Sequence, residues 1–358
     1  MRDVAAHAGV SKATVSAVLN SLGRVRRDTR DRVLHAVAEL DYRPGVAPGA
    51  AAPMGGGRGI GLLVRQADSP HAAAVVAGAR EATAAHGYTL LVASSEGDGT
   101  HEQRAVELLR AHEVVGLLMA PVLGDDSDLS HLFELVRRRR PFVLLETVRG
   151  VPASVVDVDR VQAAGGAATH LIALGHTRLA HFAGPAAAPD AEEHVDGVRR
   201  ACGGTSVAFT DADAVPAGTR VEDGYQAALA YFAGLAPVDR PTGVTCYNDL
   251  VAVGVCRALA ELGLRVPDDV SVVGVGDAPL AEYGPVPLTT VRVPGRAMGR
   301  LAAELLLVQI AALATAVPVR PERHLFGGEL VVRASTRAPP ELRARPAAPE
   351  PRVHLPAR

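Results

Sequence analysis

Four polar side chains lie close together near the start of the chain: Lys12, Thr14, Ser16 and Asn20. An ammonium group donates hydrogen bonds, whereas hydroxyl and amide groups both donate and accept them. Such a set could contact a polar partner if one helix presented it. The surrounding pattern therefore decides what these residues do.

That pattern predicts two short helices joined by a tight turn. Gly9 supplies the bend and Ser11 caps the second helix. Apolar residues recur at helical spacing on both sides of the turn, at Val4, Ala5, Ala8, Val15, Val18 and Leu19. This arrangement is a helix-turn-helix, which places the exposed residues of its second helix in a DNA major groove.

A third amphipathic helix is expected to open at residues 28–30 and to stop at residues 42–44. Its inward positions are Val33, Leu34, Val37 and Leu40. We therefore expect an all-α headpiece at residues 1–44, in which basic residues outnumber acidic ones. The alternative is a helical hairpin with a solvated charged face.

Composition indicates an ordinary globular protein with more than one core: 358 residues, 48% hydrophobic, 21% charged and a formal net charge of -2. No apolar run is long enough to span a membrane and no signal peptide is evident, so we expect a cytoplasmic protein. Cys202, Cys246 and Cys256 lie in no metal-ligand spacing and are expected to be reduced thiols. We expect no catalytic residue, metal or cofactor.

Beyond residue 59, short apolar runs alternate with helical segments, which predicts parallel sheets covered by helices on both faces. Strands are expected at 60–64, 89–93, 116–119, 142–145, 179–182, 243–246 and 271–275, and helices near 72–86, 101–112, 163–174, 225–233 and 250–262. A break near residues 155–159 divides the series into two similar halves. A ligand would then lie between them, beyond the carboxyl ends of the strands.

Two glycine-rich stretches do not match a dinucleotide fingerprint. Residues 55–61 precede a strand rather than follow one, and Pro279 stands where the stretch beginning at Gly274 would need its third glycine. Neither a nucleophile elbow nor a two-histidine metal motif is present, so an enzyme is the weak alternative.

The ordered series of motifs closely resembles the lactose-repressor (LacI/GalR) family of bacterial transcription regulators. In the headpiece it comprises residues 3–20, Val25, residues 29–30, Val33, Leu40, Tyr42 and Pro44; in the body it comprises residues 60–64, 115–118, 170–176, 183–185, 248–249, 266–274 and 287–291. The resemblance covers about nine tenths of the chain.

This resemblance implies a helix-turn-helix headpiece followed by an α/β, two-lobed periplasmic-binding-protein-like core with parallel sheets. The implied domains are the headpiece 1–44, a hinge 45–58, a core 59–337 and a disordered tail 338–358. Lobe one would comprise about 59–157 and 288–318, and lobe two about 158–287 and 319–337, with crossings near 285–287 and 318–321. It also implies a homodimer that binds double-stranded operator DNA.

The resemblance further implies roles for headpiece residues. Base-reading positions correspond to Lys12, Ala13 and Ala17, base or phosphate contacts to Thr14, Ser16 and Asn20, and phosphate contacts to Arg26 and Thr29. Hydrogen bonds at the helix end are the alternative for Thr14 and Ser16. Relatives insert a hinge leucine into the minor groove, and Ala51 occupies that position here. Pro48 and two glycines oppose a hinge helix, which in turn opposes intercalation.

The implied effector pocket also departs from the family's pattern. His71, Ala72, His194 and Gly276 replace residues that bind sugars in relatives, whereas Glu146, Asn248 and Asp277 retain or adjoin polar ligand positions. For His71 and His194 a solvent-facing loop position is equally expected. Three interpretations stay open: a repressor controlled by a small, sugar-like effector, a regulator with a degenerate effector site, and a solute-binding protein that does not act on DNA.

Overall fold

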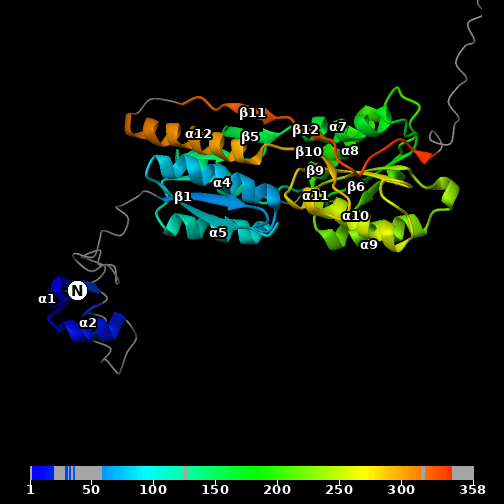
Figure 1. Ribbon diagram of the computed structural model, residues 1–358. Coiled ribbons are helices and arrows are strands. Elements are labelled where there is room, and N and C mark those ends of the chain that lie inside the picture. Colours follow the sequence, from blue (N-terminus) through cyan, green and yellow to red (C-terminus); the bar gives the residue numbers. More distant parts are fainter. Residues whose placement is uncertain are drawn as a thin grey trace, which may run out of the picture. The chain divides into compact units, whose positions relative to one another are not determined.

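The computed structural model describes residues 2–19, 29–30, 32–33, 35–36, 59–124, 127–186, 188–315 and 319–340 (Figure 1). The chain divides into two compact units, residues 1–58 and residues 59–358. The hinge with Ala51, and the tail from residue 341 onward, lie outside the described residues.

The first unit contains the predicted helix-turn-helix. Helix α1 spans Arg2–Ala8 and helix α2 spans Lys12–Leu19, and Gly9 joins them with a φ of +62° that glycine adopts without strain. Residues 29–30, 32–33 and 35–36 are also helical. One apolar cluster joins the three segments: Val4, Ala5, Ala8, Val15, Val18, Val33 and Ala36. The side chains of Leu19, Leu34, Val37 and Leu40 lie outside the description.

The second unit contains two six-stranded sheets, one in each lobe. The first sheet is parallel throughout, in the order β11-β5-β4-β3-β1-β2. Its strands are β1 Gly59–Val64, β2 Thr89–Ser94, β3 Gly116–Met119, β4 Phe142–Leu144, β5 Ser154–Val158 and β11 Arg323–Phe326.

The second sheet has the order β12-β10-β9-β8-β6-β7, and only β12 runs antiparallel to its neighbour. Its strands are β6 Leu179–Ala183, β7 Ala214–Pro216, β8 Gly243–Cys246, β9 Ser271–Gly276, β10 Thr289–Arg292 and β12 Glu329–Val331. The seven strands predicted from the sequence are all present, which confirms the parallel α/β architecture.

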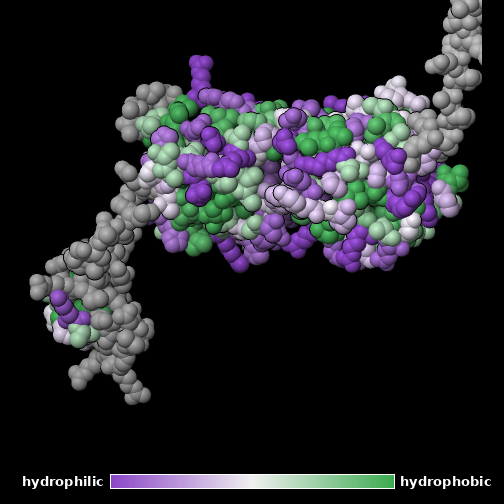
Figure 2. Space-filling view, viewed as in Figure 1, coloured by the Kyte–Doolittle hydropathy of each residue, from purple (hydrophilic) through white to green (hydrophobic). Residues whose placement is uncertain are grey.

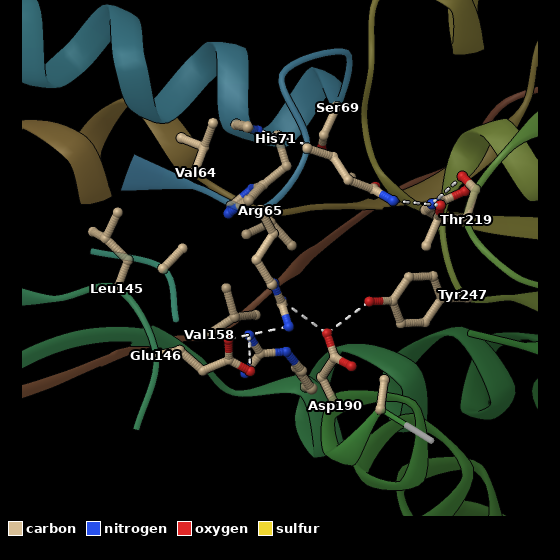
Figure 3. Close-up of a pocket in the computed structure, with 18 of the residues that line it drawn as sticks. Val64, Arg65, Ser69, His71, Leu145, Glu146, Val158, Asp190, Thr219 and Tyr247 are labelled. Carbon is tan, nitrogen blue, oxygen red and sulfur yellow. Dashed lines mark hydrogen bonds and ion pairs between the residues drawn. The ribbon is translucent and has the colours of Figure 1, made fainter. Parts of the chain in front are cut away.

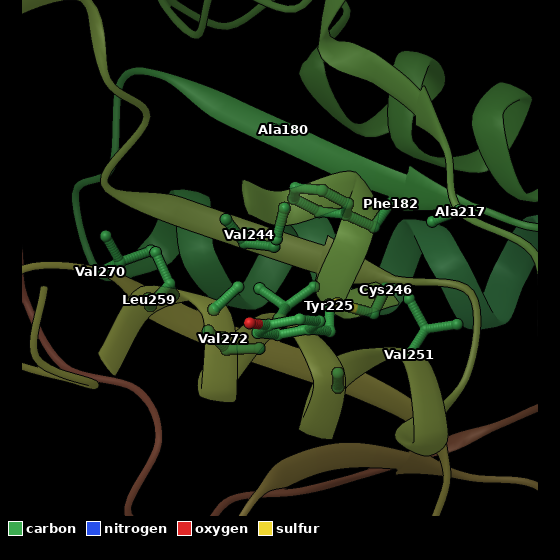
Figure 4. Packing of buried hydrophobic residues seen from close by; sticks show 14 of the residues in the cluster. Ala180, Phe182, Ala217, Tyr225, Val244, Cys246, Val251, Leu259, Val270 and Val272 are labelled. Carbon is green, nitrogen blue, oxygen red and sulfur yellow. The ribbon is translucent and has the colours of Figure 1, made fainter. Parts of the chain in front are cut away.

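Helices cover both faces of each sheet because strand side chains alternate between faces. In β1, Ile60 and Leu62 pack in a different cluster from Leu63. In the first lobe the helices are α4 Pro70–Ala85, α5 Gly99–Ala111, α6 Ser130–Arg137 and α12 Gly295–Thr315. In the second they are α7 Arg160–Ala173, α8 Pro189–Cys202, α9 Val221–Ala233, α10 Asp249–Glu261 and α11 Leu280–Tyr283, with short 3-10 turns at Asp211–Asp213 and Pro237–Asp239. Figure 4 shows the apolar cluster between β6, β8, β9, α9 and α10.

The chain passes between the lobes at positions that differ in part from the prediction. The first crossing, near residue 159, falls within the expected break. The second follows β10 and precedes α12, and the third lies at residues 327–328 between β11 and β12. Strand β10 belongs to the second sheet and β11 to the first, so the expected crossings near 285–287 and 318–321 were wrong. The assignment of residues 288–318 to lobe one was therefore wrong for β10, and that of residues 319–337 to lobe two was wrong for β11. Prolines mark interruptions in the chain, but hydrogen bonding to β9 and β12 decides which sheet holds β10.

Helices α4 and α12 approach each other closely at glycine positions. A Cβ atom placed on Gly299 would lie 2.0 Å from the carbonyl oxygen of Val75. A Cβ on Gly166, inside helix α7, would have nothing within 4 Å. The two glycines therefore form a matched pair for testing this contact.

We predict that Gly299→Ala lowers the free energy of unfolding by about 1–3 kcal/mol, because the added methyl group forces the helices apart. Gly166→Ala is expected to raise it by up to about 1 kcal/mol, because alanine is the better helix former. Urea unfolding followed by circular dichroism measures both. Equal effects of the two substitutions would contradict the close packing.

Candidate functional site

The first candidate site is the exposed surface of helix α2. Ser11 caps this helix, as predicted, because its Oγ accepts a hydrogen bond from the Thr14 amide at 3.1 Å. Lys12 and Ala13 are exposed in the first turn. The N-terminus of α2 therefore presents a cation beside a small side chain.

The structure describes the other predicted headpiece residues only in part. The Thr14 hydroxyl lies 2.9 Å from Ser11 Oγ, which is the helix-end hydrogen bond named as its alternative role. Ser16 and Ala17 belong to α2, but their side chains lie outside the description. Asn20 and Arg26 fall outside the described residues, and Thr29 is half-buried. The DNA contacts of all these residues stay predictions.

The second candidate site is a cavity of about 390 Å³ in the core. Segments that follow the carboxyl ends of strands line it in both lobes, which is where open parallel sheets bind ligands (Figure 3). Its polar lining residues are Arg65, Gln66, Ser69, His71, Glu146, Arg160, Asp190, His194, Thr219, Tyr247 and Asn248. The walls between them are mostly aliphatic.

Six of the seven predicted effector residues line this cavity: His71, Ala72, Glu146, His194, Asn248 and Gly276. The prediction was wrong for Asp277, which is absent from the lining. Its carboxylate is held at 2.7 Å by Arg292 Nε and at 2.6 Å by Arg333 Nη2. These cations hold the side chain in a separate ion-pair cluster.

Arg65 joins the two lobes across the cavity. It directly follows β1, and its guanidinium lies 3.3 Å from Glu146 in its own lobe and 3.0 Å from Asp190 Oδ2 in the other. The Tyr247 hydroxyl donates to the same Asp190 oxygen at 2.7 Å. Burial alone would lower the pKa of Arg65, but the attraction of both carboxylates outweighs it and raises that pKa.

Arg160, the first residue of α7, lies beside further carboxylates. Its guanidinium is 2.8 Å from Asp157, 3.6 Å from Glu146 and 3.5 Å from the more exposed Glu193. Burial raises the pKa of Glu146 to about 7, although Arg65 and Arg160 oppose the shift. The cavity floor is therefore a charged network rather than an aromatic platform.

His194 is not a solvent-facing loop residue, because it lies on α8 and is only 4% exposed. Its ring stacks on His181 of β6 at 6.1 Å between centroids and tilts against Tyr247 at 4.8 Å. Burial lowers the pKa of His194 to about 4 and that of His181 to about 3. Both rings are therefore neutral near pH 7. His71 is exposed, at the first turn of α4.

Asn248 has a structural role as well as a place in the lining. Its Oδ1 accepts from the Val251 amide at 2.8 Å and caps α10, and its Nδ2 donates to the Thr219 carbonyl at 2.9 Å. Gln66 of the first lobe also donates to the Thr219 hydroxyl at 3.1 Å. Asn248 thus holds the segment through which the second lobe contacts Gln66.

Four central residues of the cavity were not predicted from the sequence: Arg65, Arg160, Asp190 and Tyr247. A signal existed for Arg65 and Tyr247, because each is the first residue after a buried strand. Asp190 had none, because its partner Arg65 is 125 positions away in the sequence.

Among the described residues, no group of three or more histidine, cysteine, aspartate or glutamate side chains could hold a metal ion. None of the described helices combines the length and the hydropathy that a membrane-spanning helix needs. Cys202, Cys246 and Cys256 are free thiols.

We predict that buried, neutral His181 destabilises the protein in acid. The unfolded residue takes up a proton as the pH falls below 6.5, whereas the folded one does so only near 3. Its contribution is therefore present above pH 6.5 and is lost as the pH falls toward 3, by at most about 1.4 kcal/mol per pH unit. His181→Gln should flatten the pH dependence of the free energy of unfolding below pH 6.5. Exposed His101→Gln is the control, and equal slopes for wild type and His181→Gln would refute the prediction.

Comparisons with known proteins match both units. The profile of bacterial regulatory proteins, lacI family, matches residues 1–45, and that of the periplasmic binding protein-like domain matches residues 168–336. The HTH-type transcriptional regulators reg1 of Streptomyces lividans and MalR of Streptomyces coelicolor are each 34% identical to this chain, over 97% of it and 99% of their own length. The HTH-type transcriptional repressor PurR of Photobacterium profundum is 31% identical, over 94% of this chain and 98% of its own.

Solved structures agree. A complex of the transcriptional regulator CelR with cellobiose has a TM-score of 0.69 and 29% identity, over 93% of this chain and 98% of that one. The lac repressor dimer bound to operator and an anti-inducer has a TM-score of 0.67 and 26% identity, over 94% of this chain and 98% of that one. The chain belongs to the lacI family of bacterial transcription regulators.

Proposed function

We propose that this DNA-binding regulator is a repressor whose operator affinity depends on a small, sugar-like molecule bound between its lobes. The observation that carries the proposal is the cavity, because residues of both lobes meet in it and an occupant would contact both. A ligand with different affinities for two lobe arrangements shifts the equilibrium between them. The solved complex of CelR with cellobiose supports a sugar as the first candidate.

The proposed DNA-reading element is α2. Lys12 can donate to guanine O6 or N7 or to a phosphate, and the exposed methyl group of Ala13 can contact a thymine methyl group. One such helix supplies few base contacts. We therefore propose a two-fold homodimer on a near-palindromic operator, as in the lac repressor dimer.

Exposed apolar side chains on the core support self-association. Val92 on edge strand β2 is 49% exposed and Tyr283 on α11 is 80% exposed. Hydrophobic residues also reach the visible surface of the core in several patches (Figure 2).

We predict that the full-length protein is a dimer in solution. Light scattering at micromolar protein concentration should give twice the mass of one chain, and the mass of one chain would refute the dimer.

We predict that Lys12→Ala weakens binding to an operator obtained by in vitro selection. Loss of a base contact should weaken operator binding about tenfold, whereas loss of a phosphate contact should lower affinity for all sequences and reduce the salt slope by about one. Fluorescence anisotropy at fixed salt measures both. Arg104→Ala, which removes an exposed cation from the core, is the control. Equal operator affinity of wild type and Lys12→Ala would reject α2 as the reading helix.

We predict that filling the cavity abolishes the ligand response but preserves operator binding. Glucose, cellobiose and maltose are titrated into the operator complex, and at least one should change operator affinity about fivefold, the lower end of typical allosteric coupling. Ala72→Trp at the cavity wall should abolish this change. Exposed Ala73→Trp should retain it.

If no sugar changes operator affinity, effector control by a sugar fails. The alternative is then a regulator with a degenerate effector site. The ion pairs of the cavity support that alternative, because Arg65 and Arg160 are already paired with Glu146, Asp157 and Asp190.

A further inference from the structure

Two buried polar atoms of residues that line the cavity have neither a hydrogen bond nor an ion pair. Asp190 is 3% exposed and His194 is 4% exposed, and Asp190 Oδ1 and His194 Nδ1 make no hydrogen bond. Both residues line the cavity, and they lie four positions apart on α8, which places them on one face of that helix. Burying an unpaired carboxylate oxygen costs free energy, so these atoms mark a place where a hydrogen-bond donor is missing.

The charge of the cavity indicates what that donor carries. The carboxylates of Glu146 and Asp190 line the cavity beside the guanidinium groups of Arg65 and Arg160. Asp157 and Glu193, which are not part of the lining, also contact Arg160. Arg65 and Arg160 are the only arginine or lysine side chains in the described lining. Each contacts at least two carboxylates. An anionic ligand would therefore find no unpaired cation.

The walls limit the ligand further. They consist largely of aliphatic side chains, among them Val75, Val122, Leu145 and Val275. Tyr247 is the only tyrosine, phenylalanine or tryptophan in the described lining. A cavity of about 390 Å³ suits a small molecule. A ligand of this cavity would thus be compact and would not be held between stacked aromatic rings.

We infer that the cavity selects a small hydroxylated amine in its cationic form, whose ammonium group lies between Asp190 Oδ1 and His194 Nδ1. The ammonium donates to both atoms, and the Asp190 carboxylate attracts its charge. Phosphorylated or carboxylated analogues are rejected. This inference rests on the proposed function, because it names the class of ligand that the same cavity takes.

The test compares ligands that share one skeleton and differ in charge. Glucosamine, N-acetylglucosamine, glucose and glucose 6-phosphate are titrated calorimetrically at millimolar concentrations into the full-length protein. We expect glucosamine to bind at least tenfold more tightly than the neutral sugars, and no binding of glucose 6-phosphate. Absence of glucosamine binding, equal affinity for N-acetylglucosamine, or preference for the phosphate would each overturn the inference.

Two variants locate the ammonium group. Asp190→Asn removes the charge without changing the size of the side chain and should weaken glucosamine binding at least tenfold. Glu192→Gln removes an exposed carboxylate from the same helix and should leave it unchanged. Because Asp190 also pairs with Arg65, His194→Asn provides a variant that leaves this ion pair intact and should weaken binding several-fold. Unchanged glucosamine affinity in folded Asp190→Asn and His194→Asn would exclude this position.

The readouts separate this inference from the proposed function. Glucosamine binding without any change in operator affinity would support the ligand class and contradict effector control. A neutral or anionic sugar that changes operator affinity while glucosamine does not bind would support effector control and contradict the ligand class.

Discussion

Two arginine side chains hold three buried carboxylates together where the lobes of the core meet, and the site depends on this arrangement. A buried carboxylate without a cation or hydrogen-bond donor is costly, and removing one partner from a buried ion pair typically costs about 3–5 kcal/mol. Arg65 lies between Glu146 of the first lobe and Asp190 of the second. Any change in the spacing of the lobes must therefore rearrange charges that are shielded from solvent. An occupant that brings charge or hydrogen-bond donors of its own would contact these charged groups.

The fold provides this arrangement through strand ends and helix starts. Arg65 and Tyr247 follow strands β1 and β8, whereas Arg160 and Asp190 belong to the first turns of α7 and α8. Parallel strands bring these segments to one edge of each sheet, and the three crossings place the two edges opposite each other. Close helix packing at glycines such as Gly299 fixes the supports behind them. Segments after strands and the first turns of helices thus supply the cavity residues, and the sheets position them.

Local patterns were enough to predict much of the fold. The cap Ser11 and the spacing of Val15 and Val18 define α2 without reference to the rest of the chain, and short apolar runs mark each of the predicted strands. It was harder to predict which sheet each strand joins, because β10 joins the second lobe through hydrogen bonds that the sequence does not show. In the cavity, resemblance located His194 and Glu146 but misplaced Asp277. It did not reveal Asp190, because an ion pair between residues far apart in sequence leaves no local signal.

The measurement that tests the central claim most directly is the distance distribution between the lobes. Spin labels at exposed Glu107 on α5 and Gln226 on α9 report it by double electron–electron resonance. The claim that Arg65 joins the lobes predicts a narrow distribution for wild type and a broader or shifted one for Arg65→Met, whereas Arg80→Met, at an exposed position on α4, should leave the wild-type distribution unchanged. Identical distributions for wild type and Arg65→Met would contradict the claim that this ion-pair network sets the relation between the lobes.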